Sequence, residues 1–85
     1  MHVLVIPKGA YVNMDDFHAK ASDAEIAALI RAVGEVAKLK GLSVTGYRIL
    51  SNAGEDAHQE VPHLHIHVVG KRDLGRMIGR PKSEG

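Results

Sequence analysis

The sequence predicts an α+β domain built from short β-strands and one main helix. Three observations carry this prediction: an aliphatic run at residues 3–6 that ends at a proline, an amphipathic helical pattern from residue 22, and a segment at 61–69 that alternates between histidine and aliphatic residues. The chain has 85 residues, of which 45% are hydrophobic. A chain of this length forms one small domain that buries only about 60–65% of its unfolded surface, so we expect it to associate.

Residues 3–6, Val-Leu-Val-Ile, form a continuous aliphatic run that is followed by Pro7-Lys8-Gly9. Such a run is typical of a β-strand that is buried on both faces and stops at a turn. Residues 10–21 are expected to form a polar connection to the main helix.

The main helix is expected to begin at Ser22, because residues 22–25, Ser-Asp-Ala-Glu, have the pattern of a capping box. An apolar stripe with spacings of three and four residues follows and predicts the face that packs on the sheet. The stripe consists of Ile26, Leu29, Ile30, Val33 and Ala37. Gly41 is expected to end the helix. Gly34 costs about 1 kcal/mol relative to alanine, which suggests close packing on the sheet or on a partner subunit.

Residues 47–52 predict the next strand, whose alternate side chains point to opposite faces. Asn52 would close this strand at the mouth of the following loop. That loop, residues 53–60, is polar and is expected to be flexible.

The most informative segment is residues 61–69, Val-Pro-His-Leu-His-Ile-His-Val-Val. In a β-strand, successive side chains fall on opposite faces, so His63, His65 and His67 would share one face. Packing does not explain a histidine at every second position, because imidazole is only an intermediate core residue. The histidine face is therefore predicted to carry chemistry, and the aliphatic face is predicted to pack in the core.

A row of histidines suits chemistry at a phosphate ester. Side chains two residues apart on one strand face are separated by about 6.5–7 Å, so two adjacent imidazoles can contact one small anion. One neutral imidazole could attack phosphorus while its neighbours hold the oxygens and guide the proton of the leaving group. Histidine fits these roles because its ordinary pKa near 6.5 leaves a large neutral fraction at pH 7.

Residues 63–69, His-Leu-His-Ile-His-Val-Val, resemble the signature of the histidine triad (HIT) superfamily. Upstream, Asn52-Ala53-Gly54 and Gln59-Glu60-Val61 have the spacing of the phosphate loop in the Hint branch, the nucleoside phosphoramidases. Residues 46–48, Gly-Tyr-Arg, look like the start of the penultimate strand of that branch. Residues 2–8, His-Val-Leu-Val-Ile-Pro-Lys, look like its middle strand, with a fourth active-site histidine at the position of His2.

The resemblance implies an antiparallel sheet meander and a covalent mechanism. His65 would be the nucleophile that forms a nucleotidyl-histidine from a nucleoside phosphoramidate or dinucleotide, and water would then release the nucleoside monophosphate. His63 would orient His65 or stabilise its charged form. His67 would contact the phosphate and help to protonate the leaving amine, and His2 would complete the polar network. No metal and no cofactor would be needed, because the histidine takes the nucleophilic role.

The resemblance also implies a phosphate site and a purine nucleotide substrate, a derivative of AMP. Asn52 and the amides near Gln59 would bind phosphate oxygens together with His65 and His67.

Two positions in the loop depart from the family. His58 stands where the family usually has glycine, and a side chain there would narrow the anion pocket. Glu60 stands where some Hint relatives have a phosphate-binding serine, and its carboxylate would repel the substrate unless it turns away.

The HIT-like domain is expected to span residues 1–78, with residues 79–85 as a flexible tail. In the family, a helix and two strands precede the middle strand and carry much of the base and ribose site. The chain is therefore expected to be an N-terminally shortened member or a fragment. Because the missing strands would leave a sheet edge open, we expect a homodimer that could exchange strands.

Composition excludes other classes. The chain has no cysteine, so it has neither disulfides nor thiolate chemistry. A net charge of +1, from eleven basic and ten acidic residues, predicts no general attraction to nucleic acid or membranes. The apolar run at 3–6 is too short for a signal peptide or a membrane span, so a cytoplasmic location is expected.

Two other interpretations remain open. The chain could be a non-catalytic module that binds purine nucleotides. It could also bind zinc, because His-x-His on a strand is a metal-ligand arrangement, and His63 with His65 could be joined by Glu60 or His2. Against zinc, the third histidine would lie too far along a straight strand to reach the same ion.

Overall fold

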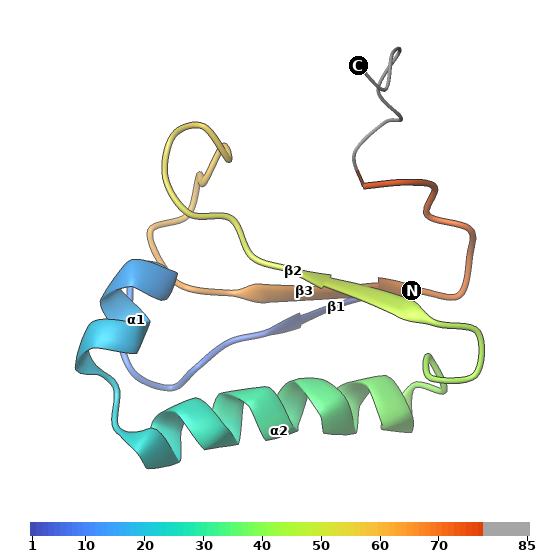
Figure 1. The fold of residues 1–85 in the computed structure, drawn as a ribbon, viewed down its shortest axis with the longest axis horizontal. Coiled ribbons are helices and arrows are strands. Elements are labelled where there is room, and N and C mark those ends of the chain that lie inside the picture. The colour runs from blue at the N-terminus through green and yellow to red at the C-terminus, as the bar shows by residue number, and fades with distance from the viewer. Residues whose placement is uncertain (78–85) are drawn as a thin grey trace, which may run out of the picture.

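The computed structural model describes residues 1–77, and these contain a three-stranded sheet and two helices (Figure 1). The elements, in chain order, are β1 (His2–Val5), α1 (Met14–Lys20), α2 (Asp23–Leu39), β2 (Tyr47–Leu50) and β3 (Ile66–Gly70). The helix α2 runs along one face of the sheet. The predicted α+β class is confirmed.

The strands lie in the order β1-β3-β2, and both pairings are antiparallel. The last strand is therefore central, which differs from the sequential order of a simple meander. In the register of the sheet, Val68 is paired with Val3 on one side and Ile49 on the other, and His67 is paired with Leu4 and Leu50. The antiparallel pairing predicted for the sheet is confirmed.

The helix α2 begins where the capping box predicts. The Ser22 hydroxyl accepts from the backbone of Glu25, and the Glu25 carboxylate accepts from the backbone of Ser22, each at 3.1 Å. Leu29, Val33 and Ala37 are buried against the sheet, as expected. Within residues 1–77, α2 is the longer helix and the main covering of the sheet.

Two details of α2 differ from the prediction. Ile30 is 56% exposed, because it follows the buried Leu29 by about 100° around the helix and leaves the packed face. Gly34 has no described atom within 4 Å of the place where a Cβ would be. The expected close packing of Gly34 on the sheet is therefore wrong.

Residues 10–21 contain a helix, α1, in place of the expected connection. The Asn13 side chain caps it by accepting from the backbone of Asp16 at 3.2 Å, and Phe17 anchors it in the core. The signal was present in the sequence as a capping residue followed by Asp15 and Asp16 in the first turn. A single buried side chain, however, gives no apolar period to detect.

The histidine strand is shorter than predicted, because β3 begins at Ile66 and residues 61–65 precede it. β1 ends at Val5 and β2 ends at Leu50, so the described sheet offers no strand partner to residues 61–65. The backbone of Leu64 instead donates to the Tyr11 carbonyl at 2.7 Å. The aliphatic side of the pattern behaves as predicted, because Leu64, Ile66 and Val68 are buried.

One face of the sheet is left open by the described residues. We call it the histidine face, and it carries His2, Leu4, Arg48, Leu50 and His67. Leu4 on this face is 50% exposed, whereas Val5 on the opposite face is 8% exposed. The expectation that residues 3–6 are buried on both faces is wrong, because α2 covers only one of them.

Among residues 1–77, neither helix has the length and apolar composition that would be needed to cross a bilayer. The expected domain boundary at residue 78 and the expected tail at 79–85 lie outside the described residues.

Candidate active site

Three histidines follow one another along the histidine face: His2 is opposite Val69, His67 is opposite Leu4, and His65 precedes the first residue of β3. His2 comes from β1, His67 from β3, and His65 from the segment that leads into β3. A cavity of about 180 Å³ lies beside them. Its lining residues are Asn52, His58, Gln59, Glu60, Val61, His65 and His67. The structure therefore brings the expected phosphate-loop residues to two of the three triad histidines.

The His65 ring is held by the backbone. Its Nδ1 lies 2.8 Å from the His63 carbonyl oxygen. A carbonyl only accepts, so Nδ1 carries the proton and Nε2 of the neutral ring keeps its lone pair. The Ser51 hydroxyl donates to the His65 carbonyl at 2.6 Å, so the backbone of His65 is held as well as its ring. His65 therefore presents an unprotonated Nε2 in its neutral form.

His63 acts on His65 through its carbonyl and not through its ring. The Nδ1 atom of His63 lies 3.0 Å from the Leu64 carbonyl, so it donates there. The His63 ring belongs to a second cavity of about 370 Å³ on the same side of the molecule. That cavity is lined by Leu4, Ile6, Val61, His63 and His65. Of its lining residues, only His65 and Val61 also line the first cavity.

His67 lies between two other imidazoles. Its ring centre is 4.9 Å from that of His65, edge to face, and its Nδ1 is 2.7 Å from Nε2 of His2. Burial lowers the pKa of His67 below its ordinary value, and the charges of His65 and His2 lower it further. His67 is therefore neutral at pH 7.

The Nε2 atom of His67 is buried and has no hydrogen-bond partner among the described residues. A buried polar atom without a partner is costly, which indicates a place for a ligand group. The hydrogen bond with His2 sets what this atom can do. When His2 donates to Nδ1 of His67, Nε2 carries the proton and can donate, and the opposite tautomers make it an acceptor.

Gln59 is placed differently from the expectation. Its side-chain amide donates to the carbonyls of Val12 and Val61, at 2.6 and 3.1 Å, and its backbone NH donates to the Gly54 carbonyl at 3.1 Å. These donors hold the loop in shape, so they are not available to a phosphate. Asn52 is half-buried and lines the cavity.

His58 has a backbone φ of +57°, in the left-handed region that glycine adopts most easily. This backbone conformation explains why the family usually has glycine at position 58, where this chain has histidine. The residue is exposed and lines the same cavity as His65 and His67.

Sequence reasoning missed two supports of the site. Ser51 fixes the backbone of His65, and Tyr11 receives the backbone of Leu64. A hydroxyl next to Asn52 was a visible clue to Ser51. Nothing in the pattern pointed to Tyr11, because the contact depends on where residues 10–21 fold.

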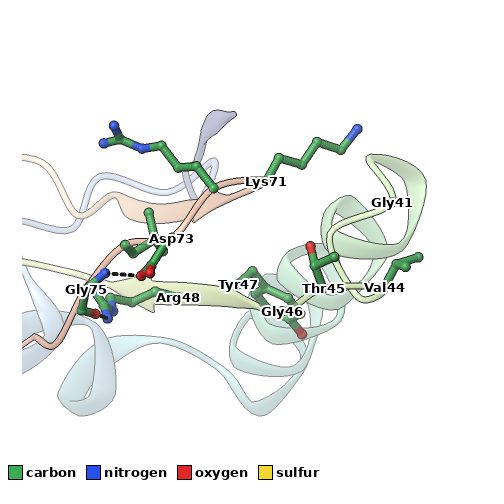
Figure 2. Close-up of a pocket in the computed structure, with 11 residues that line it drawn as sticks. Gly41, Val44, Thr45, Gly46, Tyr47, Arg48, Lys71, Asp73 and Gly75 are labelled. Carbon is green, nitrogen blue, oxygen red and sulfur yellow. Dashed lines mark hydrogen bonds between the residues drawn. The ribbon is translucent and has the colours of Figure 1, made fainter.

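A larger cavity, about 910 Å³, lies between the turn at 41–46 and residues 71–75, and none of the histidines line it (Figure 2). Its cations do not converge. Arg48 donates to the Gly75 carbonyl at 2.6 Å, whereas Lys71 extends toward Gly41. This cavity contains none of the histidines and its cations point to different places, so we place the candidate site at the histidines.

A metal centre is not formed by the residues that the structure describes. Across residues 1–77, no three side chains of His, Cys, Asp or Glu are positioned to share a metal ion. The histidines are instead engaged with one another and with backbone carbonyls.

Comparison with known proteins gives consistent matches. The sequence model of the HIT domain matches residues 1–74. A 13.2 kDa HIT-like protein of Azospirillum brasilense is 71% identical over 77 residues, covering 91% of this chain and 63% of that protein. The purine nucleoside phosphoramidase of Escherichia coli strain K12 is 32% identical over 77 residues, covering 91% of this chain and 64% of the enzyme.

A solved structure agrees. The HIT family hydrolase from Clostridium thermocellum superposes with a TM-score of 0.80 at 35% identity, covering 92% of this chain and 67% of that one. This chain spans slightly less than two thirds of the length of the two curated relatives above. The family match covers most of the chain and includes all the histidines of the site. The chain belongs to the HIT domain family, the histidine triad proteins.

Proposed function

We propose that this chain hydrolyses a nucleoside phosphoramidate through a covalent nucleotidyl-histidine on His65. The observation that carries the proposal is the hydrogen bond from Nδ1 of His65 to the His63 carbonyl. It leaves Nε2 as the basic nitrogen of the neutral ring, in a residue that lines the cavity beside Asn52 and His67.

In the first step, the Nε2 lone pair of His65 attacks phosphorus, and the bond from phosphorus to the leaving nitrogen breaks. The imidazole gains positive charge, which the His63 carbonyl stabilises through the Nδ1 proton. The leaving amine takes a proton, and the two imidazoles can relay it: Nε2 of His67 gives its proton to the amine, Nδ1 of His67 takes one from Nε2 of His2, and His2 takes one from solvent at its Nδ1, so that both rings end neutral.

In the second step, water attacks phosphorus and the bond from phosphorus to Nε2 breaks. The products are the nucleoside monophosphate and the free neutral His65. The proton lost by water can return to His67, which restores the starting tautomers of the pair with His2.

The proposed substrate is a purine nucleotide, an AMP derivative. The cavity of about 370 Å³ lined by Leu4, Ile6 and Val61 adjoins His65 and is apolar, as a base requires. The name of the phosphoramidase relative also supports this substrate class. We propose a homodimer as the working state, because a domain this small is marginal alone.

The direct test is hydrolysis of adenosine 5′-phosphoramidate by the full 85-residue chain, with and without a chelator. We expect turnover that a chelator leaves unchanged. His65→Ala should lower the rate by at least about a thousandfold, because the nucleophile is gone. His18→Ala, which removes an exposed histidine on α1, is the matched control and should turn over normally.

A nucleotide-binding module without catalysis is the second candidate. It is supported by the length of the match, because this chain corresponds to only 63% and 64% of the two curated relatives. A folded chain that binds AMP but shows no turnover would establish that candidate. Turnover by His65→Ala at the rate of the unmodified chain would refute the nucleophile assignment.

A further inference from the structure

The backbone hydrogen bonds of the central strand β3 alternate between its two neighbours. The Gly70 NH donates to the Met1 carbonyl at 3.0 Å, and the Met1 amine donates back to the Gly70 carbonyl at 3.2 Å. Both backbone groups of Gly70 are therefore turned towards Met1 and β1. Because alternate residues of a strand turn these groups to opposite sides, Val69 and His67 face β2. His65 would also face β2 if the strand were continued.

The register of the sheet identifies the residue that would pair with His65. Leu50 is paired with His67, so the next pair of this kind, two residues further on, would be Asn52 and His65. In a continued ladder, the Asn52 NH would donate to the His65 carbonyl. The structure describes both residues, and no backbone hydrogen bond joins them, because β2 ends at Leu50 and β3 begins at Ile66.

A side chain binds the carbonyl that the missing ladder bond would use. The Ser51 hydroxyl donates to the His65 carbonyl at 2.6 Å, a short distance for a hydroxyl donor. Ser51 directly precedes Asn52, so its hydroxyl takes the place of the Asn52 NH on this acceptor. Within residues 1–77, the Asn52 NH donates to no protein group.

The sheet stops at the edge of the cavity beside the histidines. Asn52 and His65 both line this cavity of about 180 Å³, together with His67. Neighbouring strands lie about 4.7–4.9 Å apart, which leaves no room for a phosphate between their backbones. A ladder that continued to Asn52 and His65 would therefore close the part of the cavity that lies between them.

We propose that Ser51 is a positioning residue that keeps the phosphate cavity open between Asn52 and His65. Its hydroxyl binds the His65 carbonyl and holds the nucleophile outside the sheet, and the Asn52 NH is left available to a phosphate oxygen. Ser51 acts through these two residues and not on the substrate. This role rests on the reaction proposed above for His65, but its consequences for the backbone and for ligand binding are measurable without turnover.

The first test is amide hydrogen exchange of the full 85-residue chain, followed residue by residue by NMR. In the unmodified chain the Asn52 NH should exchange quickly, because it has no protein acceptor. In Ser51→Ala the His65 carbonyl becomes available to it, so exchange at Asn52 should slow by about tenfold or more. A general loss of stability would speed exchange instead, so slower exchange at this residue is a specific signature.

The second test is binding of AMP, measured by isothermal titration calorimetry. Ser51→Ala should weaken binding about fivefold to tenfold, because the cavity narrows and the Asn52 NH is used within the chain. Ser51→Thr keeps the hydroxyl and should restore fast exchange at Asn52 and an affinity within about twofold of the unmodified chain. Ser43→Ala, which removes an exposed hydroxyl in the turn at 41–46, is the matched control and should change neither.

Three outcomes would overturn the proposal. The first is exchange at Asn52 or affinity for AMP that is unchanged in Ser51→Ala. The second is an equal loss in Ser51→Ala and Ser51→Thr, which would show that the hydroxyl is not responsible. The third is an unmodified chain that does not bind AMP, which would also refute the proposed substrate class. A chain that binds AMP without turnover would refute the proposed reaction alone, and the exchange and binding results would still decide the role of Ser51.

Discussion

The hydrogen bond from Nδ1 of His65 determines what this imidazole can do. In a free histidine both neutral tautomers are populated, and only one presents Nε2 as the base. The His63 carbonyl selects that one at 2.8 Å, and Ser51 holds the next peptide in place. The alternation of histidines predicted a chemical face. The hydrogen bond itself depends on residues 63–65 lying outside the strand, which begins at Ile66, and the alternation could not reveal this.

At residue 58, two effects of the side chain can be separated by substitution. His58→Gly should retain or raise turnover, because it removes the side chain from the cavity that His65 lines. It should also raise the free energy of unfolding by up to about 1 kcal/mol, because glycine accepts a φ of +57° without the cost of a Cβ.

His58→Ala is the matched control, because it removes the ring and keeps the Cβ. It should share the effect on turnover and lack the gain in stability, as measured by urea unfolding. If both variants lost turnover, His58 would have a positive role in the reaction.

The pKa of His67 predicts a dependence of stability on pH. Burial and the neighbouring imidazoles lower this pKa in the folded chain. Below the ordinary value near 6.5, the unfolded chain binds a proton that the folded chain does not, so the free energy of unfolding falls as pH falls. Above that value both states are neutral at His67, and this contribution is constant.

The measurement compares the unmodified chain with His67→Gln by urea unfolding between pH 5 and pH 8. The five other histidines are common to both, so the difference isolates His67. The slope below pH 6.5 should be shallower in His67→Gln. Parallel curves for the two proteins would contradict the lowered pKa.

At the scale of elements, the predictions succeeded where a local pattern decides the structure. The capping box at Ser22 fixed the start of α2, and a period of 3.6 residues identified its buried side. α1 was missed because Phe17 alone anchors it. β3 was predicted too long because a strand needs a partner, and the ends of β1 and β2 set its limit.

The cap of α2 gives a prediction for an element. Ser22→Ala removes the acceptor for the backbone of Glu25 and should lower the free energy of unfolding by about 1 kcal/mol, as measured by urea unfolding. Ser22→Thr keeps a hydroxyl and should lose much less. Equal losses in the two variants would show that the cap does not stabilise the helix.

Over the whole molecule, the histidine face is the feature that joins the fold to the proposed chemistry. One face of the sheet is covered by α2, and the other carries the histidines beside Leu4 and Ile6, both about half exposed. The length predicted one small domain, and the local patterns predicted its α+β class. The order β1-β3-β2 and the choice of the open face depend on long-range pairing, which the local patterns do not encode.

The central claim, that His65 becomes nucleotidylated, is tested most directly by trapping the adduct. The full chain would be mixed with adenosine 5′-phosphoramidate, quenched in alkaline denaturant within the first turnover, and analysed by intact and tandem mass spectrometry. We predict a mass increase of one adenylyl group located on His65 and absent from His65→Ala. Turnover with no adduct, or an adduct on another histidine, would contradict the account.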